Sequence, residues 1–171
     1  IALINQVDET LYVYENSAAF RSIVFGVPDS TATSGSPSGI APGDFDNGGD
    51  KEDDIVVAGA DGEVTYHHNS SGAWGTTEEE DLGQSIGGSA AIDLDLDGTD
   101  DLLVSLPDSS ESAVLYGPSS SVTIVTLPLD SSGFTEVDLD NDGDDDAVFD
   151  GPNGAGRGTI GIRVLRNDSS T

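Results

Sequence analysis

Short apolar runs separated by turn residues follow one another along the whole chain. The pattern is clearest after residue 88, where it predicts strands over 89–95, 102–106, 113–116 and 122–127. The run at 102–106 is apolar almost throughout, which is typical of a strand buried on both faces. No segment shows the 3.6-residue apolar stripe of a helix, and β-branched residues are frequent. The sequence therefore predicts an all-β chain with four short antiparallel strands per repeat.

Two segments depart from this regular pattern. Residues 30–38 are rich in Ser, Thr, Gly and Pro, which predicts a surface loop. Residues 78–81, with the sequence EEED, are the one helix-like stretch, and they are too few for a stable helix.

Three acidic segments repeat along the chain. They read GDFDNGGDKEDDIVVAG, AIDLDLDGTDDLLVSL and EVDLDNDGDDDAVFD, and their first aspartates are Asp44, Asp93 and Asp138. These aspartates lie 49 and 45 residues apart. A period of roughly 40–50 residues is typical of a four-stranded propeller blade. The segments that follow the acidic runs also repeat, with an asparagine at equivalent places: Asn16, Asn69 and Asn167.

The repeats divide the chain into four parts. We expect residues 1–28 to be the end of a preceding blade, 39–82 and 88–128 to be blades, and 133–171 to be an incomplete blade. About three to three and a half repeats are thus present, which favours part of a longer propeller or array. The alternative is a chain whose missing strands come from a neighbouring subunit, so that the ring closes by dimerisation.

Charge and composition restrict the partners. The chain has 5 Lys and Arg residues against 33 Asp and Glu residues, a formal net charge of −28. Such a field repels nucleic acid and anionic membrane surfaces and attracts cations. No apolar run approaches the ~20 residues that span a bilayer, so we expect no membrane insertion. The absence of Cys excludes disulfide scaffolds, thiolate metal sites and cysteine nucleophiles.

Two of the acidic segments have the spacing of a calcium loop. The pattern D-x-D-x-D-G-x-x-D is matched by Asp93, Asp95, Asp97, Gly98 and Asp101, and again by Asp138, Asp140, Asp142, Gly143 and Asp146. Alternate positions let three carboxylates converge on one ion, Gly allows the sharp turn, and the ninth-position Asp closes the coordination sphere. The carbonyl after Gly, at Thr99 or Asp144, is a further predicted ligand. An EF-hand is excluded because its twelfth position needs an acidic residue, and Val104 and Phe149 stand there.

The first acidic segment departs from this pattern by two extra residues near Asn47. Asp44, Asp46, Asp50 and Asp54 are the predicted ligands of a third calcium ion. His67 and His68 are adjacent, and adjacent strand residues point to opposite faces, so we do not expect them to share a metal ion. A structural or incidental role is the prediction for both. Trp74 is predicted to lie in the blade core, and the sequons at Asn69 and Asn167 leave glycosylation open.

These motifs resemble the FG-GAP/VCBS repeats, the blades of integrin α-subunit-type β-propellers. The resemblance covers nearly the whole chain and is most specific at DLDLDGTDDLLV and DLDNDGDDDAVF. It implies β-propeller blades in which each Asp loop joins the first and second strands. It also implies an extracellular setting, with calcium rigidifying one face of the propeller.

The resulting expectation is a calcium-stabilised extracellular scaffold or adhesion module of a secreted or cell-surface protein, binding a protein or glycan ligand. No catalytic set emerges, so we predict no enzyme activity. One alternative is a carbohydrate-binding, lectin-like propeller. Another is a structural subunit of a surface layer or filament that assembles through its unpaired terminal strands.

Overall fold

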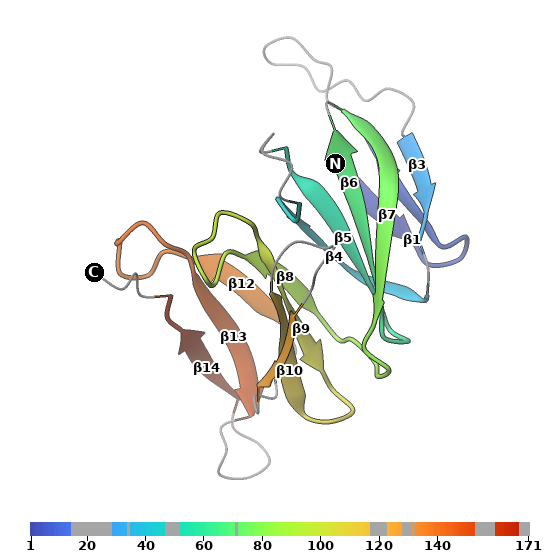
Figure 1. The fold of residues 1–171 in the computed structure, drawn as a ribbon. Coiled ribbons are helices and arrows are strands. Elements are labelled where there is room, and N and C mark those ends of the chain that lie inside the picture. The colour runs from blue at the N-terminus through green and yellow to red at the C-terminus, as the bar shows by residue number, and fades with distance from the viewer. Residues whose placement is uncertain are drawn as a thin grey trace.

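The computed structural model describes residues 1–14, 29–33, 35–46, 52–70, 72–116, 123–127, 131, 133–152 and 160–167. All regular secondary structure in these ranges is β, so the all-β prediction is confirmed (Figure 1). Nowhere in them is there a helix with the length and apolarity needed to cross a membrane.

The strands form four antiparallel sheets in the described ranges, each hydrogen-bonded in chain order. Sheet 1 contains β1 (Ala2–Asn5), β2 (Thr10–Val13) and β3 (Asp29–Ala32). Sheet 2 contains β4 (Pro37–Gly43), β5 (Asp54–Gly59), β6 (Glu63–Ser70) and β7 (Ala73–Asp81). Sheet 3 contains β8 (Ser89–Ile92), β9 (Asp101–Leu106), β10 (Glu111–Tyr116) and β11 (Thr123–Leu127). Sheet 4 contains β12 (Phe134–Val137), β13 (Asp146–Pro152) and β14 (Ile160–Leu165).

The four strands predicted between residues 88 and 128 are all present in sheet 3. The first is shorter than predicted, because the chain leaves the sheet at Asp93 to form the acidic loop. One local prediction is wrong. The predicted loop at 30–38 includes most of β3 and the start of β4, because β3 pairs with β2 along its whole length. Residues 78–81 belong to β7, where pairing with β6 overrides their weak helical preference.

The core lies between consecutive sheets. One apolar cluster joins sheets 1 and 2, a second joins sheets 2 and 3, and a third joins sheets 3 and 4. Every residue of β5 and of β9 is buried, because the two faces of each strand serve two different clusters. Ile55 and Val57 pack toward sheet 1, whereas Val56 and Ala58 pack toward sheet 3. This explains the near-continuous apolar runs of these strands, and Trp74 packs against the cluster between sheets 1 and 2, as predicted.

Candidate metal sites on the Asp loops

Each acidic segment joins the first and second strands of a sheet, as the resemblance implies. Loop 44–54 connects β4 to β5, loop 93–101 connects β8 to β9, and loop 138–146 connects β12 to β13. Strand β4 lies beside β8, and β8 lies beside β12, so the three loops emerge from the same edge of neighbouring sheets (Figure 1). Hydrogen bonds connect them: the Asp100 backbone N–H donates to the Asp44 carbonyl (2.7 Å), and Asn167 Nδ2 donates to the Asp93 carbonyl (2.8 Å).

The closing aspartates of the three loops, Asp54, Asp101 and Asp146, are each only 1% exposed. In every loop, Oδ2 of this aspartate accepts the backbone N–H of the second loop residue, from Phe45 (3.2 Å), Leu94 (3.0 Å) or Leu139 (3.2 Å). Oδ1 accepts the backbone N–H of the repeated asparagine in sheets 2 and 4, from Asn69 (2.8 Å) and Asn167 (2.9 Å). In sheets 2 and 4 the closing aspartate therefore ties its loop to the end of the third strand, a structural role that the ligand pattern alone does not reveal.

Loops 93–101 and 138–146 share one backbone design. The Asp93 carboxylate accepts the N–H groups of Asp97 (3.1 Å) and Gly98 (2.9 Å). The Asp138 carboxylate accepts those of Asp142 (3.2 Å) and Gly143 (3.2 Å) in the same way. The sixth position has a φ of 91° at Gly98 and 103° at Gly143, and no atom lies within 4 Å of where their Cβ would be. Glycine is needed there for its backbone conformation rather than for space.

Carboxylate oxygens converge in both loops. Those of Asp93, Asp95 and Asp101 lie within 4.8 Å of one another, and so do those of Asp138, Asp140 and Asp142. Oxygen-only sets of this kind fit a hard cation such as Ca²⁺.

Some predicted ligands have other partners. Oδ1 of Asp97 accepts the N–H of the buried Thr99 (2.8 Å), and Oδ1 of Asp142 accepts that of Asp144 (3.1 Å). Within the described part of the chain, Asp97 and Asp146 do not belong to the converging groups. The carbonyl ligands at Thr99 and Asp144 stay predictions.

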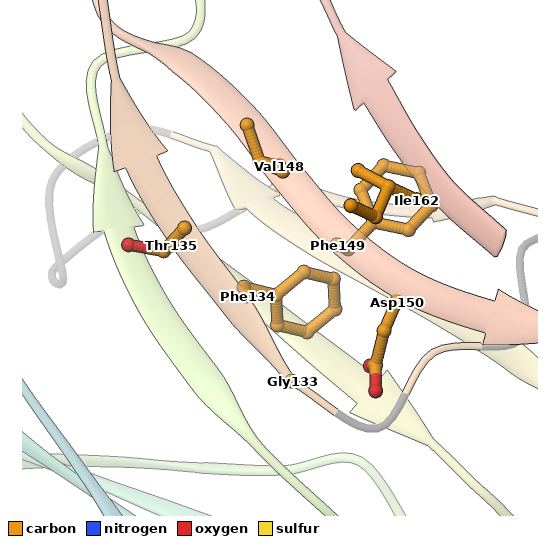
Figure 2. Close-up of a pocket in the computed structure, with 7 residues that line it drawn as sticks. All are labelled: Gly133, Phe134, Thr135, Val148, Phe149, Asp150 and Ile162. Atoms are coloured by element: carbon orange, nitrogen blue, oxygen red, sulfur yellow. The ribbon is translucent and has the colours of Figure 1, made fainter. Parts of the chain in front are cut away.

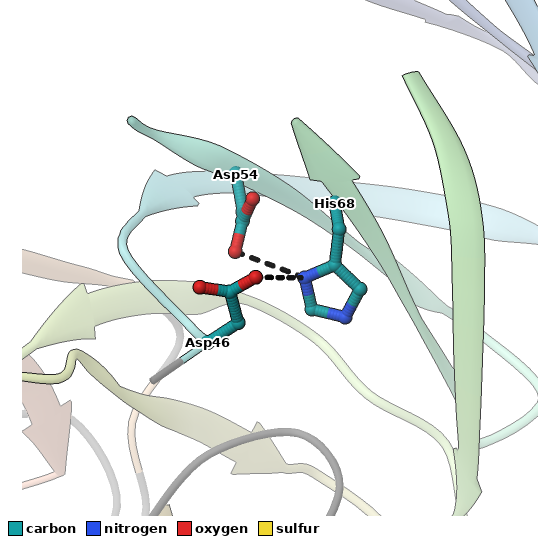
Figure 3. Close-up of side chains that lie close together, drawn as sticks. All are labelled: Asp46, Asp54 and His68. Atoms are coloured by element: carbon teal, nitrogen blue, oxygen red, sulfur yellow. Dashed lines mark hydrogen bonds and ion pairs between the residues drawn. The ribbon is translucent and has the colours of Figure 1, made fainter. Parts of the chain in front are cut away.

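Loop 44–54 brings together a different set. His68 Nδ1 lies 3.0 Å from Asp54 Oδ2 and 3.9 Å from Asp46 Oδ2 (Figure 3). Asp44 does not belong to this converging group; its backbone N–H donates to Asp100 Oδ2 in the neighbouring loop (2.8 Å). Asp50 lies outside the described residues. Sequence reasoning missed His68 as a member of this site. Its position one residue before the repeated asparagine could have indicated it.

The same position faces the acidic loop in sheets 2, 3 and 4. The strand register places His67, Leu115 and Leu165 opposite the first residue after each loop, so the next residues, His68, Tyr116 and Arg166, are equivalent. Nη1 of Arg166 donates to Asp140 Oδ2 (2.7 Å). Burial and the charges of Asp101 and Asp95 raise the pKa of the Tyr116 phenol. We call His68, Tyr116 and Arg166 the facing residues.

The loops repel one another electrostatically. A cavity of about 240 Å³ separates loops 93–101 and 138–146, and its lining includes the side chains of Asp93, Asp100, Asp144 and Asp145. Burial and nearby carboxylates raise the pKa of Asp100, although the hydrogen bond from the Asp44 N–H partly lowers it. Burial likewise raises the pKa of Asp54, opposed by the Asn69 N–H and His68. A bound cation would relieve this repulsion.

A second hollow has a different character. It measures about 340 Å³ and lies at the opposite end of β12 from loop 138–146 (Figure 2). Phe134 and Phe149 line it with ring centroids 6.0 Å apart, and Asp150 is the one ionisable residue among its seven lining residues. The hollow is therefore apolar, and the concentrated charge lies at the Asp loops.

Comparisons with known proteins support the fold. No family model matches the sequence, and no curated protein matches it. Two matching solved structures are crystals of BBS1N in complex with ARL6DN, one soaked with mercury and one with lead. Their TM-scores are 0.58 and 0.60, each at 13% sequence identity over 96% of this chain. The chain spans 46% and 42% of the matched chains, less than half their length. The four sheets are blades of a β-propeller, whereas membership of the FG-GAP/VCBS family remains a prediction.

Proposed function

We propose that this chain is a calcium-stabilised scaffold that presents a rigid propeller edge to a protein partner outside the cell. One observation carries the proposal: in two neighbouring blades, three carboxylates of one loop converge within 4.8 Å. The donors in both groups are oxygen atoms, which Ca²⁺ prefers.

The residues that would hold calcium are Asp93, Asp95 and Asp101 in one blade and Asp138, Asp140 and Asp142 in the next. The ion would supply positive charge that offsets carboxylate repulsion. Hydrogen bonds between the loops would extend the ordering of one loop to its neighbours. Asp101 accepts the Leu94 N–H and so braces loop 93–101 internally, and Asp100 joins this loop to loop 44–54. Asn167 joins sheet 4 to loop 93–101. Ordering one loop would therefore stiffen the edge of three blades.

A protein is the partner that we favour. The matched BBS1N structures are complexes with another protein, ARL6DN. The single Trp, Trp74, is partly buried and packs against the core between sheets 1 and 2, which disfavours a role in stacking on a sugar. The adhesive role and the extracellular setting follow from the resemblance to FG-GAP/VCBS repeats. The lectin-like propeller is the weaker proposal.

The test is a calcium titration of the full chain, followed by calorimetry and by thermal melting. We expect a dissociation constant of about 10⁻⁴–10⁻³ M, the range of extracellular calcium modules. At ten times that concentration each site adds about 1.4 kcal/mol, so two sites add about 3 kcal/mol. The melting temperature should rise by roughly 6–12 °C relative to the chain in chelator.

Matched double variants control for charge. Asp95→Asn/Asp140→Asn should abolish the calcium-dependent rise in melting temperature. Glu9→Gln/Asp108→Asn removes the same charge from two exposed turns at the opposite edge of the sheets, and it should retain the rise. An unchanged melting curve in chelator would contradict the proposal, and a dissociation constant below about 10⁻⁶ M would contradict its extracellular part.

A further inference from the structure

Loop 44–54 differs from the other two loops in its donor atoms. Its converging group contains Asp46, Asp54 and His68, so one donor is an imidazole nitrogen (Figure 3). The equivalent facing residues are a tyrosine and an arginine, neither of which is a usual ligand of a divalent metal ion. The distances from His68 Nδ1 are 3.0 Å to Asp54 and 3.9 Å to Asp46.

The surrounding residues hold these donors in place. The Asp54 carboxylate is 1% exposed, and it accepts backbone N–H groups from Asn69 on Oδ1 and from Phe45 on Oδ2. Such outer contacts orient a metal ligand before the metal arrives. His68 is 8% exposed and precedes a register shift in the pairing of β6 with β7, an irregularity that re-aims side chains at sheet edges.

The third donor leaves the site open to solvent. The Asp46 side chain is 34% exposed, which provides a route for an ion to enter. The preceding residue, Phe45, is 1% exposed, and its ring packs edge-on against Tyr66 with centroids 5.6 Å apart. The start of the loop is thus anchored in the core while Asp46 remains accessible.

We propose that Asp46, Asp54 and His68 form a transition-metal site that prefers Zn²⁺ to Ca²⁺. Imidazole nitrogen is a good ligand of Zn²⁺, whereas Ca²⁺ takes six to eight oxygen atoms. Tetrahedral Zn²⁺ with bonds of about 2.0–2.2 Å places its ligand atoms about 3.4 Å apart. The observed separations of 3.0 and 3.9 Å bracket that value. Three protein ligands leave the fourth position for water or a group from a partner.

This inference reassigns the third predicted calcium loop, 44–54, and it does not depend on calcium at the two loops that carry the proposed function. His67 plays no part, because it lies on the other face of β6, is 2% exposed, and faces toward sheet 1 with its pairing partner Ile55. Only one imidazole, that of His68, therefore contributes to the site, because adjacent side chains of a strand point to opposite faces.

The test is a Zn²⁺ titration by calorimetry on the full chain, in saturating calcium. We expect one Zn²⁺ per chain. His68→Gln and Asp46→Asn should each weaken binding by about 100-fold or more, since loss of even an outer-shell partner costs 10–100-fold. Co²⁺ should give visible absorption bands in the native chain that both variants lose. His67→Leu, the matched control, should keep both the affinity and the bands.

Two further comparisons make the outcome decisive. Asp95→Asn/Asp140→Asn should bind Zn²⁺ as the native chain does, even if calcium has no effect on melting, which separates this inference from the proposed function. Because His68 is buried, circular dichroism should be used to check that His68→Gln folds. If His68→Gln does not fold, Asp46→Asn, whose side chain is more exposed, tests the zinc site in its place. Undiminished Zn²⁺ affinity in Asp46→Asn, or no binding by the native chain, would overturn the proposal.

Discussion

Loops 93–101 and 138–146 have almost the same sequence and the same backbone hydrogen bonds, yet they face different side chains. Tyr116 faces the first loop, and its phenol brings no charge. Arg166 faces the second, and its guanidinium already contacts Asp140 at 2.7 Å. Loop 44–54 faces an imidazole instead. From this comparison we infer that the acidic motif builds the loop, while the residue on the third strand would influence which cation binds there.

The two loops should therefore differ in calcium affinity. Arg166 offers its own positive charge to loop 138–146 and competes with an incoming ion. The residue that faces loop 93–101 is Tyr116, which brings no positive charge; burial and the charges of Asp101 and Asp95 raise the pKa of its phenol. We expect loop 93–101 to bind calcium more tightly.

The largest effect should come from the closing aspartate, which both loops share. Asp146→Ala leaves the part-buried N–H of Leu139 and the buried N–H of Asn167 without their acceptor, so it should lower the free energy of unfolding by about 3 kcal/mol. Asp145→Ala removes an equal charge from the exposed neighbouring position and should change the free energy of unfolding by less than about 0.5 kcal/mol. Urea unfolding in chelator measures both without any contribution from calcium. Equal effects would show that Asp146 acts only through its charge.

The next largest effect should be a loss of stability at acid pH. Burial lowers the pKa of His67 from its ordinary value of 6.5 to about 4, and neither ring nitrogen has a hydrogen-bond partner among the described residues. The unfolded chain then takes up a proton near pH 6.5 that the folded chain refuses, so stability is full above that pH and falls below it. Between pH 7 and pH 5 the loss should be about 2 kcal/mol.

His67→Leu tests this directly, because sheets 3 and 4 carry Leu115 and Leu165 at the equivalent place. The variant should lose this part of the pH dependence and should be more stable than the native chain at pH 5. Thermal melting from pH 7 to pH 5 provides the measurement. An unchanged slope would assign the acid sensitivity to the carboxylates.

A smaller effect is expected at the facing residue. Arg166→Gln should raise the calcium affinity of loop 138–146 about fivefold, since an exposed charge a few ångströms away contributes about 1 kcal/mol. Tyr116→Phe removes no charge and should leave loop 93–101 unchanged. Calorimetric titration of both variants decides whether the facing residue tunes the site. An unchanged calcium affinity in Arg166→Gln would mean that the guanidinium rotates away from Asp140 at no cost when the ion binds.

The smallest expected change in stability comes from the residue at the fourth position of each loop. Leu96 has a φ of 59° and Asn141 a φ of 62°, in the left-handed region that Asn tolerates better than Leu. Leu96→Asn should therefore stabilise the chain by about 0.5–1 kcal/mol, and Asn141→Leu should destabilise it by a similar amount. Chemical unfolding of the two variants tests the sign. A loss of stability in Leu96→Asn would show that the Leu96 side chain contributes more through packing than its backbone costs.

Much of the fold could be predicted from the sequence because the apolar runs reflect burial directly. Strand β9 is buried along its whole length because its two faces pack against two sheets, and its predicted core, residues 102–106, is almost wholly apolar. β3 could not be predicted, because a short Ser- and Thr-rich strand is stabilised by its pairing with β2 rather than by its own pattern.

The candidate site was predictable only where its residues are close in sequence. Spacing within a loop places Asp93 and Asp95 together, but it cannot show that Asp101 also holds the Leu94 backbone. His68 and Arg166 come from another strand, and only the register of that strand brings them to the loop. The repeated asparagine was visible in the sequence. Its function, to donate its backbone N–H to the closing aspartate, required the structure.

The most direct test is a calorimetric calcium titration of the native chain beside Asp95→Asn and Asp140→Asn, each variant made singly. We predict two classes of site in the native chain, the tighter one lost in Asp95→Asn and the weaker one lost in Asp140→Asn. Absence of binding would refute the calcium sites. A single class weakened equally by either variant would refute the claim that the facing residue distinguishes the two loops.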